Sequence, residues 1–368
     1  MSTNKSILDI IISGNKIHGN RPEPIVSEIE IIPFNKRMNP QMAVEALLNG
    51  DCVFILDFYS TGLSILNELK YFLKTRYSNH TFDEQRDYRS VFRELSHKLL
   101  IRIYNHKLAV KKAPEIGWLK LLYPELNDFL LPFPQVQGLN SSWQWYEKGI
   151  KIPVLDFKIH PFYGTYFPTR FEHIELFDKW LSNYKGDKQS AIDIGIGSGI
   201  MSFQMLKHGF EKIYGTDINP NAIIGIHEEL KNNNQSSNIA LFYGDLFANC
   251  NLISELIVFN PPWIPASYDS KGIDKAIYYD ADLFPRFFNE AKKQLKKDGR
   301  LAIIFSNLSQ ITKGEDNHPI KYELDNGGRF QKELLFQKKV NSASDKTKRN
   351  QNWRQNEIVE LWILKTID

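Results

Sequence analysis

Five short apolar segments, each separated from the next by a stretch long enough for a helix, constrain the fold of this 368-residue chain most strongly. They occupy residues 190–196, 212–218, 239–245, 256–262 and 301–307. Strands that alternate with helices form a parallel sheet with crossover helices. Two later apolar segments, 333–340 and 357–367, are joined by a polar loop with no helix between them. We therefore expect an α/β fold whose parallel sheet is completed by two antiparallel strands.

The first 150 residues follow a different, mainly helical pattern. Asn39 and Pro40 are typical of a helix start and Gly50 of a helix end. Residues 61–77 and 83–112 are amphipathic at helical spacing, and the second stretch predicts one long helix. Its apolar positions are Tyr88, Val91, Phe92, Leu95, Leu99 and Ile103. Turn-forming residues at 137–140 indicate where this region ends.

Three parts follow from this change of pattern. We expect an N-terminal arm over residues 1–30 and a mainly helical accessory domain, suited to substrate recognition, over residues 31–150. Residues 151–368 form the α/β domain. Its first elements are a strand over 152–159, a loop over 160–170 and a helix over 172–184.

The composition excludes several classes of protein. Cys52 and Cys250 lie far apart, and neither has a Cys or His at ligand spacing, so we expect no disulfide scaffold and no metal site. No apolar run approaches the ~18 residues of a membrane span, and the opening residues are too interrupted for a signal peptide. The sequence therefore predicts a soluble, cytoplasmic protein without a membrane partner.

Basic residues are concentrated in two stretches of a chain whose net charge is only +3. Residues 86–120 hold nine basic and three acidic residues, and residues 338–354 hold six and one. Either stretch could face an anionic partner such as a nucleic acid. The other interpretation is a solvated helix face and a polar loop.

Glycines alternate with other residues where the first strand of the α/β domain ends. Asp193 is followed by Gly195, Gly197 and Gly199, which allow a sharp turn and a close approach of the backbone to a ligand. A dinucleotide fingerprint would need glycine or alanine where Ile200 stands. The pattern instead resembles the first motif of class I S-adenosylmethionine (SAM)-dependent methyltransferases, which implies that Asp193 holds the ammonium end of SAM. A turn without a ligand and a dinucleotide enzyme remain the alternatives.

Acidic residues also follow the next two predicted strands. Asp217, 18 residues after Gly199, can accept both hydroxyls of a ribose and precedes Ile218, a further candidate contact. In the methyltransferases that the glycine turn resembles, an acidic residue at the position of Asp245 accepts from the adenine amino group. Leu246 would then present its backbone amide to the adenine ring. The fold implied is the Rossmann-like class I methyltransferase fold with SAM as cofactor.

The fourth strand leads directly into Asn260, Pro261, Pro262 and Trp263. This resembles the Asn-Pro-Pro-aromatic motif of methyltransferases that act on planar amino groups. The Asn260 side-chain oxygen and the Pro261 carbonyl can each accept one N–H of such a group, and Trp263 offers a flat face to it. Asn260 also borders the expected cofactor position.

Together the motifs look closest to the release-factor glutamine N-methyltransferases, over about residues 160–310. Trp263 stands where that family usually has Tyr, and the region before residue 150 matches no substrate-binding domain of the family. The resemblance implies direct methyl transfer to a planar amide or amino nitrogen, without a metal or covalent intermediate. A protein glutamine is the favoured acceptor. The alternatives are an adenine or guanine amino group of a nucleic acid, a small molecule, or a non-catalytic SAM-binding protein.

The aromatic loop at 160–170 is expected to close over the cofactor. Tyr166 can stack on the bound molecule, and Thr169 or Arg170 can reach its methionine carboxylate. Arg170 could equally form a surface ion pair. His173, in the helix that follows, is interpreted as a structural residue or, alternatively, as a base.

Overall fold

The computed structural model describes residues 6–77, 82–232, 238–266, 278–313, 318–340 and 356–367. The chain divides into two compact units. The N-terminal unit consists of residues 20–148 and the first nine residues, and the C-terminal unit of Ile10–Gly19 and Gly149–Asp368. The segment expected to be an arm is thus shared between the units. The C-terminal unit contains most of a short hairpin from it, β1 (Asp9–Ile12) and β2 (Asn15–His18).

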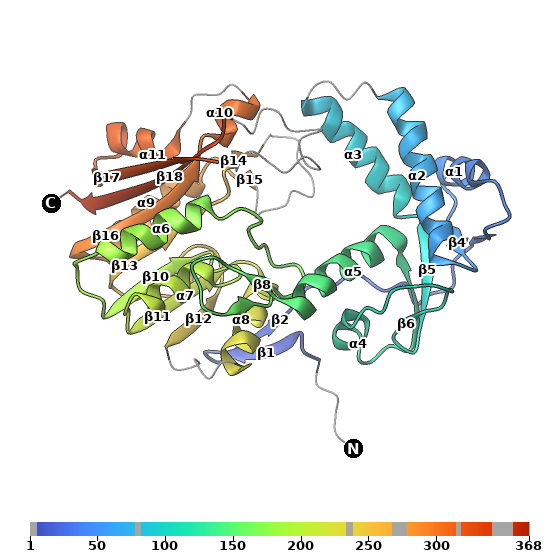
Figure 1. The fold of residues 1–368 in the computed structure, drawn as a ribbon, viewed down its shortest axis with the longest axis horizontal. Coiled ribbons are helices and arrows are strands. Elements are labelled where there is room, and N and C mark those ends of the chain that lie inside the picture. The colour runs from blue at the N-terminus through green and yellow to red at the C-terminus, as the bar shows by residue number, and fades with distance from the viewer. Residues whose placement is uncertain are drawn as a thin grey trace, which may run out of the picture. The chain divides into compact units, whose positions relative to one another are not determined.

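The N-terminal unit contains a small sheet surrounded by helices (Figure 1). The helices are α1 (Pro40–Asn49), α2 (Tyr59–Arg76), α3 (Phe82–Ser96), α4 (Trp118–Leu122) and α5 (Phe133–Lys148). The strands are β3 (Ile32–Phe34), β4 (Val53–Ile55), β5 (Leu99–Tyr104), β6 (Lys107–Leu108) and β7 (Asp128–Pro132). Strands β3, β4 and β5 are parallel, and β6 and β7 pair antiparallel with β5.

Helices hold most of the regular structure of this unit, as expected, but two details of the sequence prediction are wrong. The long helix predicted over 83–112 ends at Ser96, and Leu99 and Ile103 lie in strand β5. Both residues are fully buried on the same face of β5, together with Ile101, so their spacing reflects the buried face of a strand rather than a helix stripe. The turn expected at 137–140 lies inside α5, where Val136 and Leu139 are buried.

A seven-stranded sheet forms the centre of the C-terminal unit, in the order β12-β11-β10-β13-β16-β18-β17 (Figure 1). The five predicted parallel strands are β10 (Ser190–Ile194), β11 (Lys212–Asp217), β12 (Ile239–Tyr243), β13 (Ser254–Phe259) and β16 (Leu295–Ser306). The predicted antiparallel pair is β17 (Phe330–Lys339) and β18 (Ile358–Thr366). The α/β architecture expected from the sequence is confirmed.

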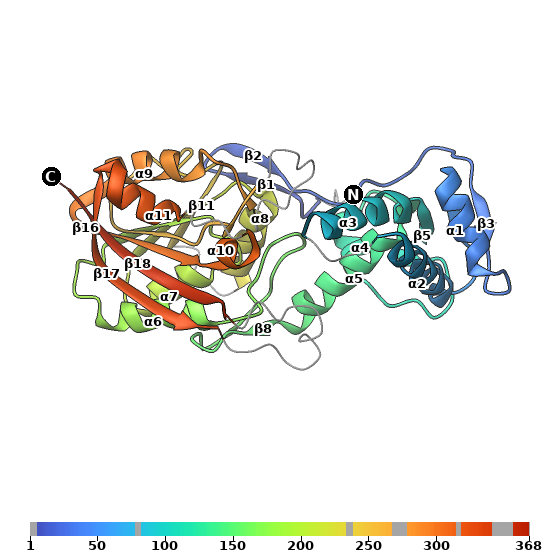
Figure 2. The same cartoon turned by 90° about the horizontal axis from the view of Figure 1, so that it is seen from above.

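Helices cover both faces of this sheet. The α-helices are α6 (Glu172–Asn183), α7 (Ile200–Lys207), α8 (Pro220–Asn232), α9 (Leu283–Gln294), α10 (Leu308–Lys313) and α11 (Pro319–Tyr322), and a π-helix spans Glu323–Gly327. Helices α6 and α7 lie on one face and α9 on the other (Figure 2). Under α9 is an aromatic core that includes Phe259, Phe287 and Phe305. This core supports the end of β13, where the Asn-Pro-Pro-Trp motif begins.

The single strand predicted over 152–159 is instead a pair of two-residue strands. These are β8 (Ile150–Lys151) and β9 (Lys158–Ile159), which pair antiparallel. Pro153 lacks the N–H that a continuous ladder would need. Two further short strands, β14 (Ile264–Pro265) and β15 (Tyr278–Tyr279), pair in parallel. Among the described residues, no helix has the length and apolar character needed to cross a membrane.

Candidate cofactor and acceptor site

The sequence motifs meet at the carboxyl edge of the parallel strands. The register aligns Ile194 with Thr216 and with Phe259, and Asp217 with Tyr243. The residues that follow β10, β11, β12 and β13 therefore emerge side by side. This is the edge at which open α/β sheets bind ligands.

The glycine turn has the backbone conformation that its residues predict. Gly195, Gly197 and Gly199 have φ values of 67°, 51° and 77°, in the left-handed region that favours glycine. A Cβ at Gly199 would lie 2.6 Å from Cδ1 of Ile226, whereas the nearest atoms to a Cβ at Gly197 are 3.8 Å away. Gly199 is thus required by packing. At Gly197 the positive φ, rather than crowding, favours glycine.

Asp217 connects the glycine turn to the next helix. Its Oδ2 accepts a hydrogen bond of 2.9 Å from the Gly197 amide, and its Oδ1 accepts one of 2.7 Å from the Asn219 amide. Asn219 in turn donates its side-chain amide to the Gly164 carbonyl at 2.9 Å, and Asn221 donates to the Tyr163 carbonyl at 2.7 Å. These bonds attach the aromatic loop to the start of α8.

Two carboxyl groups are buried at this edge. Asp193 is 2% exposed and accepts a 2.6 Å hydrogen bond from Ser202 Oγ, and Asp217 is 9% exposed. Burial, with a smaller contribution from the charge of Asp217, raises the pKa of Asp193 to about 7, although the hydrogen bond from Ser202 opposes this rise. Burial also raises the pKa of Asp217 to about 6. A cationic ligand would therefore stabilise the ionised form of both carboxyl groups.

The aromatic loop reaches the glycine turn through its backbone. A Cβ at Gly197 would lie 3.8 Å from the Tyr166 carbonyl oxygen, and the Tyr166 side chain is 54% exposed. Thr165 is buried, and its hydroxyl oxygen has no partner among the described residues. A small cavity lies between this loop, the glycine turn and α8, and its lining includes Thr165, Gly197 and Glu229. The cofactor edge thus retains unsatisfied polar capacity.

Arg170 and Thr169 differ in their surroundings. Thr169 is exposed, whereas Arg170 is partly buried and lies 3.7 Å from Glu357 in an ion pair. Glu357 is 4% exposed and immediately precedes β18. Nothing in the sequence marked it as a partner of Arg170. An acidic ligand group at Arg170 would have to share the guanidinium with this carboxylate.

Asp245 and Leu246 lie at the turn after β12. Leu246 is buried with a φ of 48°, while Asp245 forms an ion pair with Arg286 on α9. Arg286 also binds Asp282 at 2.8 Å. Ile218, after β11, is 42% exposed. Arg286 is a charged neighbour of the site that no sequence motif indicated.

The Asn-Pro-Pro-Trp motif presents one buried hydrogen-bond acceptor and one buried hydrogen-bond donor. The Asn260 Oδ1 and Trp263 Nε1 atoms are buried and have no hydrogen-bond partner within the described part of the chain. Pro261, which lies between these two residues in the sequence, is also buried. Since buried polar atoms are normally hydrogen-bonded, these two atoms retain hydrogen-bonding capacity that no described residue uses.

His173 packs against the Asn-Pro-Pro-Trp motif from helix α6. Its ring is perpendicular to that of Trp263, with centroids 5.6 Å apart and an interplanar angle of 89°. His173 is 6% exposed, and burial lowers its pKa to about 4. The imidazole is therefore neutral near pH 7 and has little basicity. This disfavours the interpretation of His173 as a base.

The basic stretches are partly neutralised where they are described. Lys338 pairs with Glu175 of α6, and Arg102 pairs with Asp128 of the neighbouring strand β7. Lys111 lies over the Phe58 ring, with Nζ 5.8 Å from its centroid. Residues 341–354 of the second stretch are outside the described residues. No group of residues able to hold a metal ion occurs in the described ranges.

Comparison with known proteins identifies relatives of the C-terminal unit. The family model "Methyltransferase small domain" matches residues 175–314. A protein of Methanocaldococcus jannaschii named "Putative protein N5-glutamine methyltransferase" is 36% identical over 167 residues, which cover 44% of this chain and 80% of that protein. A release factor glutamine methyltransferase of Dictyoglomus turgidum is 36% identical over 90 residues, 23% of this chain and 32% of that enzyme.

Among solved structures, a ribosomal protein L11 methylase from Lactobacillus delbrueckii subsp. bulgaricus is similar at a TM-score of 0.40 and 19% identity. The match covers 60% of this chain and 93% of that protein. The family model starts at residue 175 and therefore covers no part of the N-terminal unit.

Proposed function

The chain belongs to the class I SAM-dependent methyltransferases related to the release-factor glutamine N-methyltransferases, and from this we propose that it methylates the side-chain amide nitrogen of a protein glutamine. The observation that carries the proposal is the buried Asn260 Oδ1 after β13, which has no hydrogen-bond partner among the residues that the structure describes. This oxygen is a hydrogen-bond acceptor in the motif with which related enzymes bind a planar amino group. The names of both relatives, which specify glutamine methylation, support the choice of acceptor.

The cofactor edge fits SAM. When bound, SAM supplies an electrophilic methyl group on a positively charged sulfur. Asp193 and Asp217, whose pKa values are raised by burial, are suited to its ammonium group and its ribose hydroxyls. Asp245 and Leu246 follow β12, and in this proposal the carboxylate of Asp245 and the backbone amide of Leu246 would contact the adenine ring. The absence of a side chain at Gly197 would allow the ligand to lie close to the backbone of the turn.

The acceptor residues compensate for the weak nucleophilicity of an amide. The amide nitrogen lone pair is delocalised into the carbonyl, so the nitrogen must be held in line with the methyl group. Asn260 Oδ1 and the Pro261 carbonyl can each accept one N–H. Fixing two reactants in this way removes about 7–11 kcal/mol of the barrier. The amide nitrogen would gain the methyl group as the sulfur–methyl bond of SAM breaks and its electron pair stays on sulfur, and one N–H proton would leave to solvent. His173, with its pKa lowered to about 4 by burial, is not suited to take that proton.

The test is methyl transfer by the wild-type protein and by Asn260→Ala. We expect radiolabelled methyl from SAM to enter a protein of an extract from cells that lack this chain, and to be released by protease but not by nuclease. Acid hydrolysis of the labelled protein should release labelled methylamine, which is the product expected from N5-methylglutamine. Asn260→Ala should abolish turnover while its SAM dissociation constant stays within about threefold of wild type.

Two results would contradict the proposal. Release of the label by nuclease alone would indicate a nucleobase amino group as the acceptor. Loss of SAM binding in Asn260→Ala would show that this residue holds the cofactor rather than the acceptor.

A further inference from the structure

We propose that His173 is a positioning residue that fixes the orientation of the Trp263 indole for the incoming acceptor. This inference rests on the proposed function, in which Trp263 contacts the acceptor amide. It assigns to α6 a role that neither the motifs nor the relatives specify. His173 does not touch the reacting atoms and acts only through Trp263.

The first support is the way in which Trp263 is held. Its Nε1 has no hydrogen-bond partner among the described residues, so among these residues packing alone orients the ring. One neighbour is the aromatic core under α9, against which Trp263 packs. Another is His173, whose perpendicular ring lies 5.6 Å away. Perpendicular ring pairs are a favoured geometry, so this contact restricts rotation of the indole.

The second support is the burial and charge state of His173. It is 6% exposed on a helix whose other buried residues include Ile174 and Phe177. Because burial lowers its pKa to about 4, its ring is neutral at the pH of the reaction. A neutral ring packs against the indole without the desolvation cost of a charged one.

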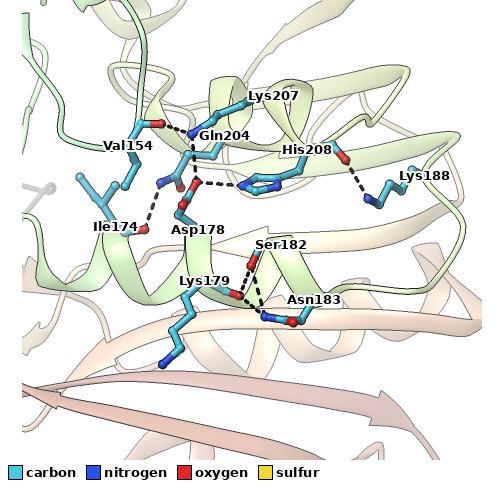
Figure 3. Close-up of polar contacts among 10 residues, drawn as sticks. All are labelled: Val154, Ile174, Asp178, Lys179, Ser182, Asn183, Lys188, Gln204, Lys207 and His208. Atoms are coloured by element: carbon cyan, nitrogen blue, oxygen red, sulfur yellow. Dashed lines mark hydrogen bonds and ion pairs between the residues drawn. The ribbon is translucent and has the colours of Figure 1, made fainter.

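The third support is the attachment of α6 to α7, shown in Figure 3. Gln204 Nε2 donates a 3.0 Å hydrogen bond to the carbonyl oxygen of Ile174, the residue after His173. One turn further, Asp178 Oδ1 lies 2.8 Å from His208 Nε2 and 3.7 Å from Lys207 Nζ. Helix α7 starts directly at the glycine turn. His173 therefore sits on a helix that is fixed relative to the cofactor edge.

The experiment compares His173→Ala and His173→Phe with wild type. Asn183→Ala, an exposed change near the end of α6, is the matched control. The 19F NMR resonance of Trp263 in 5-fluorotryptophan-labelled protein, assigned with Trp263→Phe, reports the order of the ring without any acceptor. The SAM dissociation constant and kcat on a glutamine-containing protein substrate at saturating SAM complete the comparison.

We expect His173→Ala to shift or broaden the Trp263 resonance and to lower kcat about tenfold, with the SAM dissociation constant within about twofold of wild type. His173→Phe, which keeps an aromatic ring, should largely retain both the wild-type Trp263 resonance and the wild-type kcat. Asn183→Ala should change neither.

An unchanged Trp263 resonance in His173→Ala would overturn the inference. So would a loss of SAM affinity with an unchanged kcat, because His173 would then act on the cofactor side. If the wild-type protein fails to methylate glutamine, the proposed function fails instead, and the resonance alone decides whether His173 orders Trp263.

Discussion

At the scale of single residues, two buried carboxyl groups determine how the cofactor edge responds to pH. Asp193 and Asp217 have pKa values raised to about 7 and about 6, in both cases mainly because burial disfavours the charged form. Below these values the protein without ligand holds a proton on each group. A cationic ligand favours the ionised forms, so its binding lowers both pKa values and releases protons.

The affinity for SAM should therefore rise as the pH increases from about 5 to about 7. At about pH 5 binding must remove protons from Asp193 and Asp217, whereas at pH values above their pKa both are already ionised. Isothermal titration calorimetry in buffers of different ionisation enthalpy measures the affinity and the protons released. Asp193→Asn should bind SAM more weakly and with a flatter pH profile. Proton uptake on binding would contradict the assignment.

The positions of the motif residues could be predicted because they depend on short-range pattern. Asp193, Asp217, Asp245 and Asn260 each come at or just after the end of an apolar segment, and parallel strands bring such ends together. Their neighbours could not be predicted in the same way. The contacts of Asp245 with Arg286, of Arg170 with Glu357 and of His173 with Trp263 join distant parts of the chain. They depend on packing that no local spacing encodes.

At the scale of elements, the sequence predicted strands better when helices separate them. The five parallel strands stand out because each apolar run is flanked by turn residues and a helix pattern. Strand β5 was misread because α3 precedes it with only His97 and Lys98 between them, so the apolar spacing continues without a break. The pairing of β5 with β4, β6 and β7, which local spacing does not encode, distinguishes it from a helix.

Strand β18 depends on a buried carboxylate for its place in the sheet. Glu360 accepts hydrogen bonds from Gln337 Nε2 at 2.8 Å and from Trp362 Nε1 at 2.8 Å, and its Oε2 lies 2.9 Å from His318 Nε2. These hydrogen bonds lower the pKa of Glu360 despite its burial. The network joins α11, β17 and β18 through one side chain.

Glu360→Ala should consequently destabilise the C-terminal unit by about 3 kcal/mol, because it leaves several buried donors unpaired. Glu360→Gln keeps one acceptor oxygen and should cost less. Urea unfolding followed by circular dichroism measures both changes. Glu333→Ala, at the partly exposed ion pair with Arg300, is the control and should cost less than about 1 kcal/mol. Equal losses in Glu360→Ala and the control would show that the network does not stabilise the strand.

At the scale of the whole molecule, the two units are interleaved in sequence. The C-terminal unit includes Ile10–Gly19, which lies between the two segments of the N-terminal unit in the chain, Met1–Asp9 and Asn20–Lys148. Ile10 and Ile17 of this hairpin are 8% and 1% exposed. A chain that starts at Gly149 therefore retains every cofactor and acceptor residue discussed above but lacks a buried part of its own unit.

Residues 149–368 alone should bind SAM but melt at a lower temperature than the C-terminal unit in the full chain. Loss of two buried isoleucines costs about 3 kcal/mol, or roughly 10 °C for a unit of this size. A second variant, in which a flexible linker replaces residues 20–148, keeps the hairpin and should recover that loss in calorimetric scans. Neither variant should methylate the acceptor at the wild-type rate, because the N-terminal unit is proposed to recognise it. Full turnover by the linker variant would show that acceptor recognition lies in the C-terminal unit. Equal melting temperatures of the two variants would show that the hairpin contributes nothing to the stability of the C-terminal unit.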